Sequence, residues 1–163
     1  MKDKRLLIAR IVMTVLSVGA VCFIFGNSLM NADDSSELSE GVLEMLNRWL
    51  CSLRIDFELD SFTVRKAAHF TEFAVLGALL CSTAYLYLFK RLRSALIAVP
   101  LGALTAVCDE LIQTASEGRS CQITDMLIDT SGVLTGTLIV LLMITLIIRN
   151  KKNKIITEGE NNG

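Results

Sequence analysis

Four long apolar stretches, separated by polar segments, dominate the pattern of hydrophobic and polar positions along the chain. They cover about residues 6–25, 67–89, 94–114 and 125–148. An α-helix rises about 1.5 Å per residue, so each stretch is long enough to cross a hydrocarbon layer of about 30 Å. The pattern predicts an all-α fold, a polytopic membrane four-helix bundle formed by residues 1–154, and a disordered polar tail at 155–163.

The first apolar stretch follows the basic residues Lys2, Lys4 and Arg5, an arrangement that also occurs in signal peptides. Its apolar run is longer than the usual core of a signal peptide. It ends at Phe25 without a small-residue cleavage site. We therefore expect this stretch to be retained as a transmembrane helix.

The loop between the first two stretches contains a helical pattern of its own. Its apolar residues recur at helical spacing: Leu38, Val42, Met45, Leu46, Trp49, Leu50 and Leu53. This pattern predicts an extra amphipathic helix in the first extracytoplasmic loop, which either lies on the outer membrane interface or covers the bundle. A plain packing role without a function of its own is the simpler interpretation of such a helix.

The distribution of charge predicts the orientation of the helices. Basic residues cluster before the first span, between the second and third spans and after the fourth: Lys2, Lys4, Arg5, Arg10, Lys90, Arg91, Arg93, Arg149, Lys151, Lys152 and Lys154. Residues 27–64 carry eight acids but only Arg48 and Arg54 as basic residues. The positive-inside rule then places both termini in the cytoplasm of a multi-pass protein. The net charge of −1 gives no reason to expect a nucleic-acid partner.

Several polar residues lie where they are costly, because a charge at the centre of a membrane span costs about 2.5–3.5 kcal/mol. They belong to three segments of the chain: Arg65, Lys66, His69, Glu72, Asp109, Glu110, Gln113, Arg119, Asp125 and Asp129. In the predicted topology the second and fourth helices begin on the outer side and the third ends there. We therefore expect these residues to converge on a polar pocket in the outer leaflet.

Two interpretations of this convergence stay open. In the first, Arg65 or Lys66 pairs with Asp109 or Glu110, and the residues form a structural network that sets helix register. In the second, they form a site, where Glu72 would orient His69, one turn away, for general-base catalysis. His69 and the four acids could also hold a divalent metal, but their spacing is not diagnostic, so neither a metal nor a cofactor is predicted.

Glycines and cysteines give less information about the fold and the site than the polar residues do. Gly132 and Gly136 form a GxxxG motif, which predicts close helix packing. The five cysteines show no CxxC pair. A disulfide between Cys51 and Cys121, which lie in loops on the same predicted side, is left open.

Taken together and in order, the polar motifs resemble the VanZ-like family of bacterial membrane proteins. The resemblance rests on FGNSLM from Phe25, RKAAHFTEFAVLG from Arg65, DELIQ from Asp109, GR at Gly118 and DMLIDTSGVLTG from Asp125. It implies a four-helix domain in the bacterial cytoplasmic membrane, with the ten polar residues above as its site. At Asp129 the resemblance implies asparagine in many relatives, so a role that needs a neutral amide is in doubt here.

The namesake of the family is associated with resistance to glycopeptide antibiotics such as teicoplanin. The resemblance therefore implies a protein that binds or acts on cell-envelope lipids, cell-wall precursors or lipophilic glycopeptides. An intramembrane hydrolase or transferase that uses His69 and Glu72 is the alternative. A proton-coupled transporter is disfavoured because the chain lacks an inverted repeat. Oligomerisation is left open.

Overall fold

The computed structural model describes residues 2–30, 32–55, 58–116 and 121–161, and its described part is entirely helical apart from turns. Five helices follow one another along the chain: α1 (Lys2–Ser28), α2 (Ala32–Ser52), α3 (Ser61–Leu88), α4 (Arg91–Gln113) and α5 (Ile123–Asn161). Four of them are long and apolar enough to cross a membrane, namely α1, α3, α4 and α5. The predicted all-α bundle of four spans with an additional helix is confirmed.

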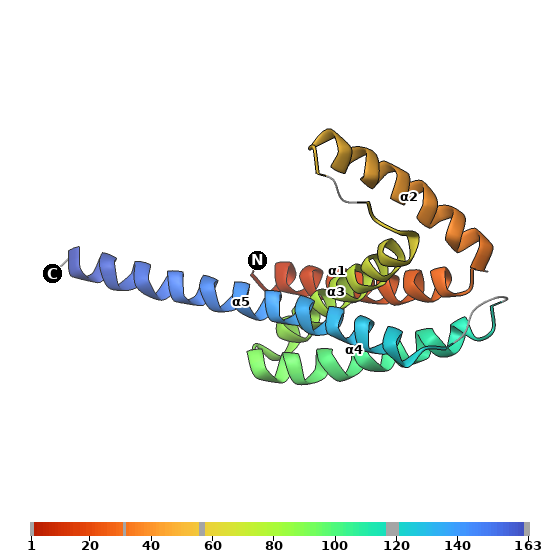
Figure 1. The fold of residues 1–163 in the computed structure, drawn as a ribbon. Coiled ribbons are helices and arrows are strands. Elements are labelled where there is room, and N and C mark those ends of the chain that lie inside the picture. The colour runs from red at the N-terminus through yellow and green to blue at the C-terminus, as the bar shows by residue number, and fades with distance from the viewer. Residues whose placement is uncertain (1, 31, 56–57, 117–120, 162–163) are drawn as a thin grey trace.

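The four spanning helices run alternately up and down, so α1 and α4 end at the same side of the bundle where α3 and α5 begin (Figure 1). We call this side the polar end of the bundle. At the opposite side Arg10 donates to the carbonyl oxygen of Leu86 at 3.0 Å, and Arg91 donates to Thr145 at 2.8 Å. The predicted basic clusters, which fall in the first turns of α1 and at the start of α4, therefore lie at this basic end.

Two helix boundaries differ from the sequence prediction by six residues or more. Helix α3 begins at Ser61, six residues before the predicted span, and its N-cap is Asp60, whose carboxylate accepts from the amide of Thr63 at 3.2 Å. In place of the disordered tail predicted from residue 155, α5 continues to Asn161 and projects beyond the other helices (Figure 1). Residues 137–157 contain no glycine or proline, the two residues that most disfavour a helix. Lysines and apolar residues such as Ile155 and Ile156 therefore allow α5 to continue into the predicted tail.

Helix α2 lies to one side of the bundle, where it packs mainly against α3 (Figure 1). Asn47 joins it to the start of α3, because its side chain both donates to and accepts from the backbone of Leu59. The apolar residues Met45 and Trp49 remain exposed, at 63% and 68%. The predicted amphipathic helix is therefore present, but it covers little of the bundle.

The interior of the bundle is small and unusually polar, whereas leucine, isoleucine and valine cover its outer faces. The apolar core consists of Ile24, Phe73, Leu76, Ala106 and Val133. Serine, threonine and acidic side chains are buried beside it, while apolar residues on the outside are exposed. This distribution suits a protein in lipid, because the hydrocarbon gives apolar side chains no reason to turn inward.

Glycines bring α3 and α5 into close contact, and these two helices pack together more extensively than any other pair. A Cβ atom on Gly132 or Gly136 would lie closer than 3.0 Å to the backbone of α3, at Phe70 and Ala74 respectively. Gly77 of α3 has the same relationship with the backbone at Val133. The close packing predicted from the GxxxG motif is confirmed, and it sets how the polar residues of α3 and α5 face each other.

Candidate functional site

The polar end of the bundle collects nine of the ten predicted site residues, which come from α3, α4 and α5. Arg119, the tenth, lies outside the described residues. Four of the nine are fully or almost fully buried: Asp109, Glu110 and Asp129 at 0% exposed, and Gln113 at 6%. The predicted convergence of three segments at one side of the bundle is therefore present in the structure.

One ion pair across this end joins Lys66 to Asp125, whereas the structural interpretation of the sequence paired Arg65 or Lys66 with Asp109 or Glu110. The side chains of Lys66 and Asp125 are only 12% and 17% exposed. The glycine contacts bring α5 directly alongside α3, and Asp125 in the first turn of α5 lies within ion-pair distance of Lys66. Arg65 forms no ion pair within the described part of the chain.

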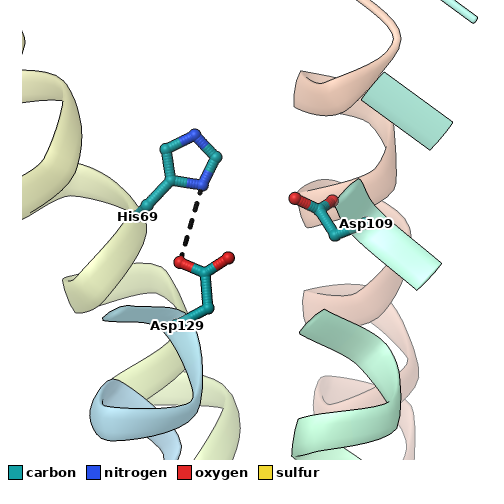
Figure 2. Close-up of side chains that lie close together, drawn as sticks. All are labelled: His69, Asp109 and Asp129. Atoms are coloured by element: carbon teal, nitrogen blue, oxygen red, sulfur yellow. Dashed lines mark ion pairs between the residues drawn. The ribbon is translucent and has the colours of Figure 1, made fainter. Parts of the chain in front are cut away.

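His69 faces Asp129 of α5, with its Nδ1 atom 3.9 Å from Oδ1 of the acid (Figure 2). The carboxylate of Asp109 approaches the same space from α4 (Figure 2). One ligand atom from each of these three residues lies within 4.8 Å of the others. Three helices thus contribute an imidazole and two buried carboxylates to one small volume.

The predicted partnership between His69 and Glu72 is replaced by two different contacts. Glu72 accepts a hydrogen bond from Asn27 of α1 at 3.1 Å, and His69 is oriented toward Asp129 instead. On α3 the two residues are neighbours at i and i+3, but Glu72 faces α1 whereas His69 faces α5. Two residues one turn apart on a helix can therefore contact different neighbouring helices.

Asp109 is held by side chains from α1 and α4. Ser28 donates to its Oδ1 atom at 2.5 Å, and Gln113 donates to Oδ2 at 3.0 Å. Glu110, the next residue, accepts from the backbone amide of Gln122 at 2.8 Å and so anchors the chain just before α5. The acids of α4 are thereby linked to α1 and to the start of α5.

Asp129 differs from the other acids. Neither of its carboxylate oxygens has a hydrogen-bond partner among the described residues, although both atoms are buried, and the same holds for Oε1 of Glu110. Buried polar atoms in proteins are almost always hydrogen-bonded, because an unpaired one costs about 1–3 kcal/mol and more when it is charged. These oxygens are therefore available as acceptors or as ligands.

Asn27 and Ser28 of α1, with Gln122 before α5, are the polar partners that the sequence prediction missed. A signal for the first two existed, because both belong to the FGNSLM segment that ends an otherwise apolar stretch. Polar residues at the end of a span are normally solvated by water and head groups. Here Asn27 and Ser28 instead donate hydrogen bonds to acids of α3 and α4, which only the packing of the helices brings close.

An apolar groove of about 410 Å³ lies between α1 and α3, next to this cluster. It is lined by Ala20, Phe23, Ile24, Ala68, Thr71, Glu72 and Val75. Glu72 is the only lining residue with an ionisable group, and its partner Asn27 is adjacent in α1 to Ser28, which bonds to Asp109. Glu72 thus connects the groove with the buried acids behind it.

The arrangement allows three kinds of chemistry at the polar end. The carboxylates can accept hydrogen bonds from hydroxyl or amine groups, the imidazole can exchange a proton, and His69 with Asp109 and Asp129 offers a set of metal-binding atoms. Cys51 and Cys121 contribute to none of these, and both are free thiols in the structure.

Comparison with known proteins gives one match. The model of the VanZ/LLP1 family matches residues 13–145, which run from the middle of α1 to the apolar part of α5. No curated protein and no solved structure matches the chain.

Proposed function

This chain belongs to the VanZ/LLP1 family, and on that premise we propose that it binds an amphiphilic molecule of the cell envelope within the membrane. The groove between α1 and α3 takes the apolar part of the ligand, and the polar end of the bundle receives the head group. The observation that carries the proposal is the position of Glu72, which lies on the wall of an apolar groove and bonds to Asn27, the neighbour in α1 of the Ser28 that bonds to buried Asp109.

The groove supports an apolar ligand group by its size and its lining. Its volume of about 410 Å³ falls within the range of small-molecule sites, about 300–1,000 Å³. Phe23 and Val75 on its rim are 60% and 52% exposed, so the groove opens toward lipid. Because lipid chains fill the same groove equally well, apolar contacts position a ligand but contribute little selectivity.

Selectivity comes from the polar head group. Glu72, Glu110 and Asp129 present carboxylate oxygens, which accept hydrogen bonds and do not donate them when ionised. A complementary ligand carries hydroxyl or amine donors next to an apolar tail. Glycosylated or aminated lipids, lipid-linked cell-wall precursors and lipophilic glycopeptides all have this chemistry.

The proposal places the polar end in the outer leaflet of the bacterial cytoplasmic membrane, with both chain termini in the cytoplasm. The basic residues around Arg10 and Arg91 support this orientation, because they lie at the opposite end of the bundle and positive charge favours the cytoplasmic side. A ligand of the outer leaflet reaches the site without crossing the membrane. Reduced susceptibility to a glycopeptide is one expected consequence.

Binding is tested with teicoplanin as the probe, added to the purified full-length protein in nanodiscs. Ala68→Trp fills the groove, and Glu72→Gln removes its charge while keeping the shape of the side chain. Leu104→Trp is the matched control, because Leu104 is 58% exposed on α4 and does not line the groove. We expect both groove variants to weaken binding at least tenfold and the control to leave it unchanged.

Susceptibility of cells that express the same variants provides the second measurement. Teicoplanin susceptibility should fall with the wild-type protein and return with Ala68→Trp, while immunoblots show equal amounts in the membrane. If neither teicoplanin nor vesicles of envelope lipids bind the wild-type protein, the proposed function is wrong. Binding that is equally strong in Ala68→Trp would place the ligand elsewhere on the protein.

A second candidate function is an intramembrane hydrolase or transferase that acts on a lipid-linked substrate. The proximity of His69 to Asp129 favours it, because a carboxylate beside an imidazole fixes its orientation and stabilises its protonated form. His69 would take the proton of an attacking water or hydroxyl and return it to the leaving oxygen. Turnover of a lipid-linked substrate should stop in His69→Ala while the protein remains folded, and normal turnover would exclude this role.

A further inference from the structure

The buried oxygens of Asp129 are the feature that the binding of an amphiphile leaves unexplained. Asp129 is 0% exposed, and neither oxygen has a hydrogen-bond partner within the described part of the chain. Both its oxygens and the imidazole of His69 face the carboxylate of Asp109 across one space (Figure 2). A buried carboxylate without hydrogen bonds requires a cation or a proton.

The geometry points to a divalent transition-metal site formed by His69 of α3, Asp109 of α4 and Asp129 of α5. Their ligand atoms lie within 4.8 Å of one another, and Nδ1 of His69 is 3.9 Å from Oδ1 of Asp129. Two ligands bound at about 2.1 Å lie at most about 4.2 Å apart, so small side-chain rotations bring all three within bonding distance of one ion.

The donor set indicates the class of metal. One imidazole nitrogen and two carboxylates suit Mn²⁺, Zn²⁺ or Fe²⁺, whereas Ca²⁺ and Mg²⁺ prefer oxygen ligands alone. The supporting contacts also fit, because Ser28 and Gln113 donate to Asp109, and hydrogen-bonded carboxylates are typical around metal ligands.

A divalent cation also suits the acidic surroundings of this space. Asp109 and Asp129 are both fully buried, and Glu110, the residue next to Asp109, is 0% exposed as well. A divalent ion bound by His69, Asp109 and Asp129 would hold α3, α4 and α5 together at the polar end.

Metal binding is measured without any amphiphile, so this proposal and the proposed function fail independently. Mn²⁺ is the first probe, added to the metal-stripped full-length protein in detergent and followed by electron paramagnetic resonance. Thiols do not compete well for Mn²⁺, which avoids the exposed cysteines Cys22, Cys51 and Cys121. We expect one equivalent of Mn²⁺ per chain and a rise in Tm when the ion is added.

Loss of a residue that only supports a metal ligand weakens metal binding by about 10- to 100-fold. Asp129→Asn and His69→Ala each remove a ligand, so each should weaken Mn²⁺ binding by more than that. Glu44→Gln is the control, because it removes an exposed carboxylate of α2 and should leave binding unchanged. If a variant does not fold, the X-ray absorption spectrum of the wild-type protein with Co²⁺ gives the same information. It should show nitrogen and oxygen ligands and no sulfur.

Three results would overturn the proposal. The first is the absence of Mn²⁺ and Zn²⁺ binding to folded wild-type protein, and the second is undiminished binding in Asp129→Asn. The third is sulfur coordination in the Co²⁺ spectrum, which would locate the ion at cysteines. If Asp129 carries a proton instead of a metal, the Tm of the wild-type protein should not rise when metal is added, and Asp129→Asn should be at least as stable as the wild-type protein.

Discussion

Gly136 of α5 lies directly against the backbone carbonyl of Ala74 in α3, with no room between them for a Cβ atom. The oxygen that such an atom would meet belongs to the backbone of a spanning helix and cannot rotate away. The contact therefore determines how closely the two helices approach, and with that the separation between His69 on α3 and Asp129 on α5.

Gly136→Ala should separate α3 from α5 and lower stability by about 1–3 kcal/mol, the usual cost of overpacking. Thermal unfolding of the purified protein in detergent measures the effect. Gly19→Ala is the matched control, because nothing lies within 4 Å of a Cβ atom at that position. The control should be neutral or more stable by up to about 1 kcal/mol, since alanine favours helix more than glycine does. Equal behaviour of the two variants would contradict the close contact.

Lys66→Ala and Asp125→Ala should each destabilise the protein strongly, by about 3–5 kcal/mol, because each leaves a mostly buried charge without its partner. The double variant should lose less than the sum of the two, with a coupling energy of about 0.5–3 kcal/mol. Thermal unfolding of all four proteins measures this energy.

The exposed pair of Arg48 and Glu44, 81% and 69% exposed, is the internal comparison and should couple by only about 0.3–0.5 kcal/mol. Arg65→Ala and Glu110→Ala should be additive, since the structure shows no ion pair between them. Strong coupling of Arg65 with Glu110 would restore the pairing predicted from the sequence.

Glu110→Ala should loosen the start of α5, because the backbone amide of Gln122 loses its acceptor. A hydrogen bond to a charged group contributes about 1.5–3 kcal/mol, so we expect a loss of that order. Glu110→Gln keeps an acceptor oxygen and should lose less. Hydrogen exchange at the amide of Gln122 reports the contact directly, and equal protection in wild type and Glu110→Ala would show that the bond is not formed.

The N-cap of α3 should make its first turn sensitive to acid. The hydrogen bond from Thr63 lowers the pKa of Asp60 below its ordinary value. A carboxyl group with a lowered folded-state pKa stabilises the fold above its unfolded-state pKa of about 3.9, and this contribution is lost as the pH falls through the folded-state value. The amide of Thr63 should therefore lose protection from exchange below about pH 4.

Asp60→Asn provides the control for this step, because asparagine also caps helices but does not titrate. Its protection should be lower than in wild type at neutral pH and constant across the acid range. An acid step of the same size in Asp60→Asn would assign the transition to another group.

The proposed orientation predicts which cysteines react from outside the cell. Cys51 and Cys121 are exposed and belong to the segments that join α1 to α3 and α4 to α5, both of which connect helices at the polar end, so a membrane-impermeant maleimide should label both in intact cells. A cysteine introduced by Arg91→Cys, at the basic end, should react only after the cells are opened. Labelling of position 91 but not of residues 51 and 121 in intact cells would invert the orientation.

The sequence predicted the four spans well because lipid imposes a strong requirement on any segment that crosses it. Backbone polar groups must be satisfied within a helix, and the side chains that face hydrocarbon must be apolar over about 20 residues. The start of α3 was missed by six residues for the same reason. A criterion based on apolar runs excludes Arg65 and Lys66, whereas the capped helix includes them.

The sequence also predicted which residues gather at the polar end, but it did not predict which of them contact each other. Alternating topology places the ends of α1 and α4 beside the starts of α3 and α5, whatever the details of packing. Which acid meets Lys66 depends on the rotation of each helix about its axis and on a few ångströms of separation. Glu72 shows the limit clearly, because it lies beside His69 in the sequence pattern but bonds to Asn27 of α1.

By itself, the sequence determined that this protein is a bundle of four spanning helices with its ionisable groups at one end, because hydrophobic length and charge position act locally along the chain. The tertiary structure alone decided that His69, Asp109 and Asp129 share one buried space and that Lys66 pairs with Asp125. Glycine contacts of α5 with α3 and α4 contribute to those relationships, at Gly132, Gly136 and Gly102. Such contacts set distances between helices that no single segment encodes.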